Sequence, residues 1–239
     1  MYYKNFSEII GTVPKNDLER YFLKNKGGRG IHKWFHYFEI YDRYFSKFRG
    51  KEITLLEIGV QNGGSLQMWK SYFGPLAKIY GIDINPDCKQ FEDDQIEIFI
   101  GSQEDPVFLD EIKNKIPMVD ILIEDGGHTM NQQIITYEKM FSHLKEDSIY
   151  LCEDLHTSYW SEVYGGGLKK QNTFIEYSKN FIDYINAWHI PNFDPNYETK
   201  NIFGIHFYDS ILVLEKRKIN QPYHSSNGIL IHPILPSNE

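Results

Sequence analysis

The sequence predicts an α/β fold with a mostly parallel sheet that ends in an antiparallel C-terminal hairpin. Short apolar runs alternate with helical segments between residues 53 and 153, as is typical of βαβ units. Near the end of the chain, the apolar runs 202–208 and 211–215 are separated only by Asp209 and Ser210. So short a link permits a hairpin but not a parallel crossover. We expect a seven-stranded sheet with helices on both faces.

The remaining elements follow from hydrophobic spacing and from glycine and proline positions. Aromatic residues before residue 50 predict a short helix, a loop at 27–30 and a longer helix that includes Trp34. The predicted strands are 53–58, 78–83, 96–100, 118–124, 148–153, 202–208 and 211–215. The predicted helices that follow residue 50 are 65–73, 106–115, 131–144 and 172–188.

The composition limits the class of protein and the partners that it can have. The chain has 239 residues, 41% of them hydrophobic, which suits one domain with small additions. We expect a helical cap at 1–50, the α/β domain at 51–218 and an extended arm at 219–239. The formal net charge of −8 and the lack of a long Lys/Arg cluster predict no nucleic-acid partner. No apolar run is long enough to span a bilayer, and residues 1–6 resemble no signal peptide. We therefore expect no membrane partner and a cytoplasmic location.

A glycine-rich turn follows the first predicted strand, with the sequence Glu57-Ile-Gly-Val-Gln-Asn-Gly-Gly-Ser65. Gly59 would let the backbone approach a ligand closely, and Gly63 would permit a tight turn into the next helix. Ser65 could cap that helix, whose free N–H groups favour a carboxylate. Taken alone, this turn predicts only a nucleotide-type cofactor.

The spacing Glu-x-Gly-x-x-x-Gly-x-Ser differs from the Gly-x-Gly-x-x-Gly of dinucleotide binders. Glu57 would repel a pyrophosphate but could hold the ammonium group of a methionine moiety. Asp83 ends the second strand, where it could accept hydrogen bonds from two ribose hydroxyls. Ser102 and Gln103 follow the third strand, where ribose and adenine contacts are needed. With the antiparallel end of the sheet, these residues predict S-adenosylmethionine in a Rossmann-like class I methyltransferase sheet. The structural alternatives are a helix cap for Asp83 and a solvated loop position for Gln103.

Acidic residues also follow the fourth and fifth predicted strands. Asp125 comes after the fourth strand, and Glu153 and Asp154 end the fifth, so all three lie at one rim of the sheet. There they would flank the methyl end of the cofactor, which Asp125 would also contact. Adjacent carboxylates repel one another unless a cation or protons intervene, and an all-oxygen set suits Mg²⁺. His128 follows two glycines and could fold back over the site to take a proton from a hydroxyl. Helix capping by the two aspartates and a structural histidine are the alternatives.

In these motifs the chain resembles the metal-dependent sugar O-methyltransferases of macrolide and polyketide biosynthesis, the macrocin and mycinamicin type. The resemblance runs from about residue 32 to 215 and is strongest at 57–60, 63–65, 125–128 and 153–160. It implies that Asp125, Glu153 and Asp154 bind Mg²⁺ and that His128 is the general base toward a saccharide hydroxyl. Members of the family often have serine where this chain has Gly127. They also tend to have a longer N-terminal region, which is used in assembly and in covering the acceptor. The resemblance allows a homo-oligomer, but the shorter start here leaves both the oligomeric state and the acceptor open.

The acceptor is the least constrained part of the prediction. Residues 158–167 are rich in aromatic residues and glycine and are expected to cover the acceptor, with Tyr159 and Trp160 stacking on a sugar. A catechol-like diol would need the same metal and stays an alternative. A metal-dependent hydroxylase or hydrolase is less favoured, because the two-histidine set of non-heme iron is missing from these motifs. A non-catalytic subunit would have no need of the acidic residues and His128.

Overall fold

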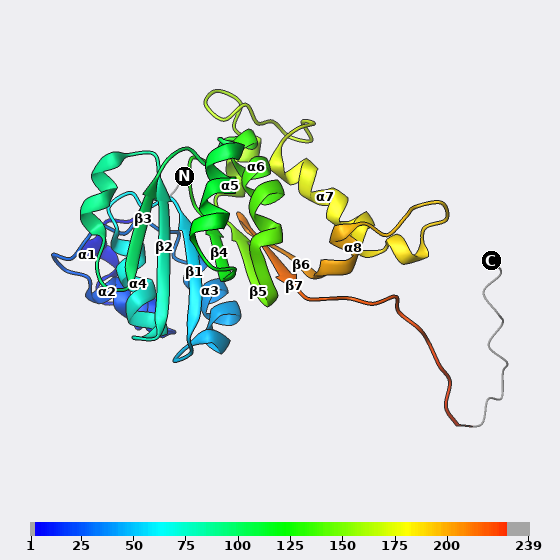
Figure 1. The fold of residues 1–239 in the computed structure, drawn as a ribbon. Coiled ribbons are helices and arrows are strands. Elements are labelled where there is room, and N and C mark those ends of the chain that lie inside the picture. Colours follow the sequence, from blue (N-terminus) through cyan, green and yellow to red (C-terminus); the bar gives the residue numbers. More distant parts are fainter. Residues whose placement is uncertain (1–2, 229–239) are drawn as a thin grey trace.

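The computed structural model describes residues 3–228, which form a seven-stranded sheet between two layers of helices (Figure 1). The strands are β1 (Ile53–Ile58), β2 (Ala77–Asp83), β3 (Ile96–Ile100), β4 (Val119–Glu124), β5 (Leu144–Cys152), β6 (Ile202–Tyr208) and β7 (Ile211–Lys216). Their spatial order is β3-β2-β1-β4-β5-β7-β6. The first five strands pair in parallel, whereas β7 pairs antiparallel with both β5 and β6. The predicted sheet with its antiparallel hairpin is confirmed.

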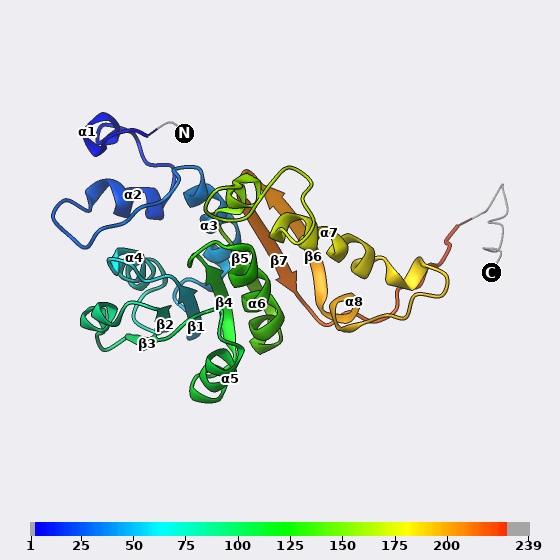
Figure 2. The same cartoon turned by 90° about the horizontal axis from the view of Figure 1, so that it is seen from above.

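Helices cover both faces of the sheet, as the sequence predicts (Figures 1 and 2). The α-helices are α1 (Phe6–Ile9), α2 (Asp17–Lys24), α3 (Tyr37–Phe45), α4 (Gly64–Phe73), α5 (Pro106–Lys115), α6 (Met130–Met140), α7 (Phe174–Ile185) and α8 (Tyr197–Asn201). The short 3₁₀-helices are η1 (Ser46–Phe48), η2 (Pro86–Phe91), η3 (Phe141–His143), η4 (Leu155–Tyr159) and η5 (Ala187–His189). The α3 and α4 helices pack on one face, and α5, α6 and α7 pack on the other.

Adjacent residues of β1 show why its sequence is a continuous apolar run. Leu55 belongs to the apolar cluster that contains Tyr41 of α3 and Trp69 of α4. Leu56 belongs to the cluster on the opposite face, with Tyr137 of α6. All of these side chains are buried, so the strand has no solvent-facing side. Such a strand is typical of a parallel sheet that is covered on both faces.

The N-terminal segment departs from the expected helix. Residues 25–36 form neither helix nor strand, and α3 begins at Tyr37, whose N–H donates to the carbonyl of Trp34 at 3.0 Å. Trp34 therefore precedes the helix, and its prediction as a helical residue was wrong. The reason is tertiary: this irregular segment places side chains, including Lys33, along the walls of the cavities described below.

The boundary between α6 and β5 also differs from the prediction. The helix ends at Met140 instead of residue 144, and β5 starts at Leu144 instead of residue 148. Lys216 of β7 contacts the link between them, because its buried Nζ donates to the carbonyls of Phe141, at 3.2 Å, and of Leu144. The carbonyl of Phe141 also accepts from the N–H of Leu144, which closes η3 before β5 begins.

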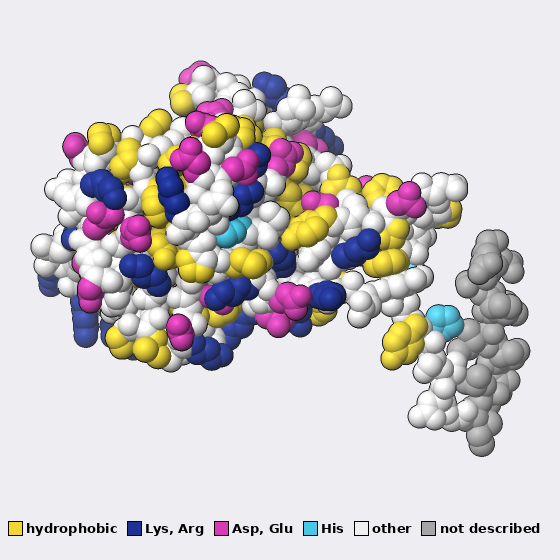
Figure 3. Space-filling model, in the orientation of Figure 1, with side chains coloured by type: hydrophobic (Ala, Val, Ile, Leu, Met, Phe, Trp, Pro, Cys, Tyr) yellow, Lys and Arg dark blue, Asp and Glu magenta, His cyan; other side chains and the backbone are white. Residues whose placement is uncertain are grey.

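The described part of the C-terminal arm does not line the two cavities discussed below. The described part of the arm, residues 219–228, extends away from the sheet (Figure 1), and residues 229–239 lie outside the described part. Within residues 3–228, no helix has both the length and the apolar character that crossing a membrane requires. On the face that Figure 3 shows, positive and negative side chains are interspersed and do not form a field of one sign.

The direction of strand addition reverses between β1 and β4, and this reversal positions the site. The chain adds β2 and β3 on one side of β1, and then β4 and β5 on its other side. Ligands of open α/β sheets bind beyond the carboxyl ends of strands at such a point. The backbones meet closely there: the N–H of Asp125 donates to the carbonyl of Ile58 at 2.9 Å. A Cβ added to Gly59, where φ is +99°, would lie 1.8 Å from the carbonyl oxygen of Asp125.

We predict that Gly59→Ala lowers the free energy of unfolding by about 3–5 kcal/mol, because a strained φ and a backbone clash add together. Gly74→Ala is the matched control, since Gly74 also has a positive φ (+90°) but no atom near its added Cβ. It should cost about 1–3 kcal/mol. Urea denaturation of both variants measures the difference; equal losses would show that the contact with Asp125 is unimportant.

Candidate functional site

The turn between β1 and α4 forms one wall of the site. Gly63 is the residue before α4 and has a left-handed backbone, with φ of 67°. Ser65 lies inside the helix, and its hydroxyl donates to Oε2 of Glu57 at 2.7 Å. The expected capping role of Ser65 was therefore wrong, because Gly63 occupies the capping position and the serine hydroxyl turns toward the buried acid.

A cavity of about 500 Å³ lies beside this turn. The predicted cofactor residues that line it are Gly59, Ser65, Asp83, Ser102, Gln103 and Asp125. Glu57 and Gly63 are not among its lining residues. Glu57 is fully buried and contacts Ser65 and Lys33, both of which do line the cavity. The lining of the cavity therefore does not support a direct contact between Glu57 and a cofactor. Gly63 shapes the turn and does not face the cavity.

Asp83, at the end of β2, is held by the backbone of the same turn. Its Oδ2 accepts hydrogen bonds from the N–H groups of Val60 and Gln61, and its Oδ1 accepts one from Asn85, each at 2.9 Å. Burial raises the pKa of Asp83, but these three donors outweigh burial and leave the pKa below its ordinary value. The carboxylate is thus charged at the cavity wall and keeps further lone pairs for hydroxyl donors.

Gln103 is buried, not solvated. Its Nε2 donates to Glu124 at 2.7 Å and to Thr136 at 3.1 Å, and its Oε1 accepts from the N–H of Gly127 at 2.8 Å. Both ends of the amide are therefore committed to the chain, and the side chain holds the turn after β4 in place. Ser102 is half-buried and lines the cavity beside it.

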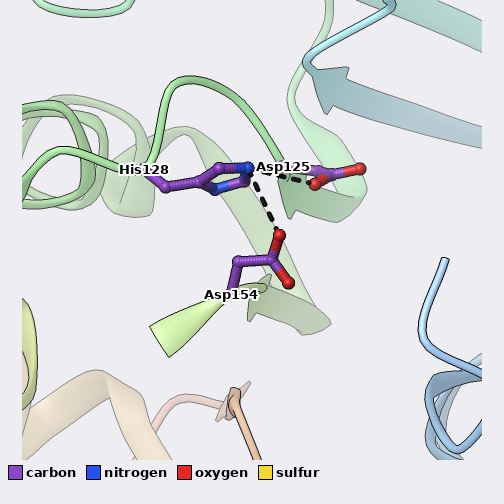
Figure 4. Close-up of side chains that lie close together, drawn as sticks. All are labelled: Asp125, His128 and Asp154. Atoms are coloured by element: carbon purple, nitrogen blue, oxygen red, sulfur yellow. Dashed lines mark ion pairs between the residues drawn. The ribbon is translucent and has the colours of Figure 1, made fainter. Parts of the chain in front are cut away.

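Two acids and a histidine converge at the ends of β4 and β5 (Figure 4). His128 Nε2 lies 3.7 Å from Oδ1 of Asp125 and 3.5 Å from Oδ2 of Asp154. His128 and Asp154 both have left-handed backbones, with φ of 59° and 56°. The hydroxyl of Thr157 donates to the carbonyl of His128 at 3.0 Å and so holds this turn. Both strained residues are thus fixed with their side chains facing one another.

Glu153 lies next to this group but faces a different set of partners. Its side chain is buried; Oε1 accepts from the hydroxyl of Tyr41 at 2.6 Å, and Oε2 accepts from Lys33 at 2.9 Å. Burial and the neighbouring Asp125 raise the pKa of Glu153 well above its ordinary value. Asp125, Asp154 and His128 offer ligand atoms that all lie within 4.8 Å of one another. Because carboxylates and imidazole are metal ligands, these residues fit a divalent ion.

Three residues of the N-terminal region complete the cluster, and the sequence patterns did not identify the contacts that they make. Lys33 contacts Asp125 and Glu153, and the hydroxyl of Tyr37 donates to Asp154 at 2.8 Å. Tyr41 donates to Glu153, as described above. The pair Tyr37 and Tyr41 has the helical spacing of four residues, but nothing local indicates that hydroxyls so spaced would reach strand-end acids.

A second cavity, of about 920 Å³, meets the first at the acids. His128 and Asp154 line both cavities. Rings lie near this junction: Trp34 and Trp160 both pack against His156, with ring centroids at 5.6 and 4.5 Å. Farther from the junction the walls are largely apolar and come from the N-terminal region, with Phe6, Ile9, Phe22 and Phe35. Of the two rings predicted to stack on a sugar, Trp160 lines this cavity and Tyr159 does not.

Comparison with known proteins supports the resemblance seen in the motifs. No protein-family model matches the chain. Mycinamicin VI 2''-O-methyltransferase of Micromonospora griseorubida is 35% identical over 189 residues, which are 74% of this chain and 47% of that protein. Demethylmacrocin O-methyltransferase of Streptomyces fradiae is 32% identical over 214 residues, or 84% of this chain and 52% of that protein.

A solved structure is similar over the same region. The MycE methyltransferase from the mycinamicin pathway, in complex with Mg, SAH and mycinamicin VI, has a TM-score of 0.74 and 33% identity. The similarity covers 85% of this chain and 54% of that one. The homologues are thus sugar O-methyltransferases, and the class I methyltransferase fold is confirmed. The chain spans about half the length of the curated relatives that it matches.

We predict that Asp83→Asn weakens the binding of S-adenosylhomocysteine about tenfold, because a charged hydrogen-bond acceptor on the cavity wall becomes neutral. Isothermal titration calorimetry measures the dissociation constant. Asp87→Asn is the matched control at an exposed position of η2, and it should bind like the unaltered protein. Unchanged binding by Asp83→Asn would restrict Asp83 to a role in holding the turn.

Proposed function

We propose that the protein is an S-adenosylmethionine-dependent O-methyltransferase that acts on a sugar hydroxyl of a glycoside, with Mg²⁺ at the acidic cluster. The observation that carries this proposal is the meeting of two cavities at His128 and Asp154. One cavity has the loop and acid expected for the methyl donor, and the other has rings and apolar walls. A group transferred between two bound molecules must pass through such a junction.

The smaller cavity suits the donor. Asp83 presents a charged carboxylate to ribose hydroxyls, and Gly59 of the turn after β1 lines the same cavity. The first turn of α4 adds N–H groups that favour the carboxylate of a methionine moiety. When bound, S-adenosylmethionine supplies a sulfonium methyl group. The chain's contribution is to align the acceptor oxygen with it, and alignment can be worth roughly 7–11 kcal/mol.

Asp125 and Asp154 are best placed to hold the ion, each through the oxygen that faces His128. Glu153 is the predicted third ligand. When bound, Mg²⁺ would orient two adjacent hydroxyls and favour the ionised form of one. His128 would accept the proton of the reacting hydroxyl at Nε2, which faces both carboxylates. The hydrogen bond from Thr157 to the histidine carbonyl would fix the direction from which the proton is taken.

The larger cavity favours a glycoside over a catechol. The rings of Trp34, His156 and Trp160 beside the junction suit the face of a sugar. The apolar walls beyond them are far larger than a single catechol ring would need, and they suit an apolar aglycone. The relatives act on glycosylated antibiotics by name, which supports the same acceptor class.

Three further expectations stay predictions. They are a cytoplasmic location, the lack of nucleic-acid and membrane partners, and a homo-oligomer.

Methyl transfer to glycosides tests the proposal directly. We expect S-adenosylhomocysteine to form from S-adenosylmethionine with members of a panel of aryl 6-deoxyhexosides that carry a vicinal diol. Excess EDTA should stop turnover, and added Mg²⁺ should restore it. Catechol and the matching free sugars serve as competing acceptors. Full turnover in EDTA would contradict the metal role, and turnover of catechol alone would contradict the acceptor class.

We predict that His128→Ala lowers the rate of methyl transfer about 10²–10⁴-fold, the range typical of a lost general base. Calorimetry should show nearly unchanged affinity for both S-adenosylhomocysteine and Mg²⁺. A loss of Mg²⁺ affinity would instead identify His128 as a metal ligand, which its distances from Asp125 and Asp154 also allow. Normal turnover would remove His128 from the mechanism altogether.

A further inference from the structure

Lys33 is a buried cation inside the acidic cluster. Its side chain is 3% exposed, and its Nζ contacts Asp125, lies 2.9 Å from Oε2 of Glu153 and lies 3.9 Å from Oε1 of Glu57. It comes from the irregular segment 25–36, far from all three acids in the sequence. A buried lysine is stable only when it is paired, and the three carboxylates hold it in place.

The hydrogen bonds of the cluster show which carboxylate oxygens Lys33 contacts. Both carboxylate oxygens of Glu153 have donors within the chain, namely Tyr41 and Lys33. Asp125 contacts Lys33 through Oδ2 and turns Oδ1 toward His128. Asp154 is bonded by Tyr37 through Oδ1 and turns Oδ2 toward His128. Each oxygen of Glu153 therefore already accepts a hydrogen bond, and Oε2 is in contact with a second cation while Lys33 stays where it is.

A divalent ion and Lys33 need the same negative charge. Lys33 contacts Asp125, which is a member of the candidate metal group, and it holds an oxygen of Glu153. Two cations that share one carboxylate repel each other strongly in a buried site, where water screens little. Lys33 also lines both cavities, so that a displaced side chain has open space to enter.

We propose that Lys33 is an internal competitor of the metal: its ammonium group occupies the Glu153 side of the acidic cluster, and Mg²⁺ binding requires it to withdraw. This inference rests on the proposed metal site and adds a residue that sets its affinity. Lys33 is thus a positioning residue, which keeps Glu57, Asp125 and Glu153 together when no ion is bound. It acts on the reaction through the metal ligands.

The segment that carries Lys33 would respond to the metal. Gly27, with φ of +79°, Gly28 and Gly30 precede the lysine. The backbone of Gly30 packs directly on Gly64 at the start of α4, where an added Cβ would lie 2.2 Å from the Gly30 carbonyl. Release of Lys33 removes the ion pairs that tie this segment to β4 and β5. Segment 29–36 should then exchange its amide hydrogens faster.

The test is a calorimetric titration with Mg²⁺ alone, in the absence of acceptor and donor. Lys33→Met should bind Mg²⁺ at least tenfold more tightly than the unaltered protein. In the double variant Lys33→Met/Glu153→Gln this gain should disappear, because the freed ligand has lost its charge. Lys145→Met is the matched control: it removes the same charge from an ion pair with Asp120, at the amino end of the same strands. Its affinity should be unchanged.

A second measurement on the unaltered protein keeps the test independent of the folding of the variants. Mg²⁺ should increase both hydrogen exchange in segment 29–36 and the acetylation of Lys33, each followed by mass spectrometry. Equal or weaker Mg²⁺ binding by Lys33→Met would overturn the proposal, as would added protection of Lys33 by Mg²⁺. If neither the unaltered protein nor Lys33→Met binds Mg²⁺, the metal site itself fails. Binding by both with equal affinity refutes only the competition.

Discussion

The backbone contact between β1 and β4 is the constraint on which the rest of the site depends. These strands are neighbours in space although the chain forms β2 and β3 between them, so their carboxyl ends share one crevice. Gly59 lies against the backbone of Asp125 because it has no side chain. The loop proposed for the donor and the first acid of the proposed metal site are therefore in direct backbone contact. The carboxyl end of β5 then brings Glu153 and Asp154 to the same rim.

Much of this arrangement follows from the sequence because parallel strands align their ends. Asp83, Asp125 and Asp154 each follow an apolar run, and the rule that such ends meet at one edge was sufficient to place them. The hairpin of β6 and β7 was predictable for a similar reason, since its link is too short for a crossover. Here the local pattern and the tertiary structure agree.

The parts that could not be predicted depend on contacts that leave no local pattern. Lys33 reaches Asp125 and Glu153 across 92 and 120 residues, from a segment that forms neither helix nor strand. Aromatic spacing placed Trp34 in a helix, but this segment is irregular and lines the two cavities. Gln103 was expected as a solvated residue or an adenine contact, and its burial against Glu124 becomes visible only when the sheet is assembled. Side-chain networks of this kind depend on the whole fold.

The α3 helix has a dual role, with consequences for how the protein can change. One face of the helix packs in the apolar core, where Tyr41 stacks on Phe45 and meets Trp69 edge to face. The hydroxyls of Tyr37 and Tyr41 bond to Asp154 and Glu153. The same two rings thus serve both the core and the acids. Under the proposed function, repacking this helix for heat tolerance would also disturb the acids that hold the metal. Phe22 and Phe35 of the larger cavity pack on Phe38 of the same helix, so changes in that wall also reach the core. Stability, metal binding and acceptor choice therefore cannot be changed independently through α3.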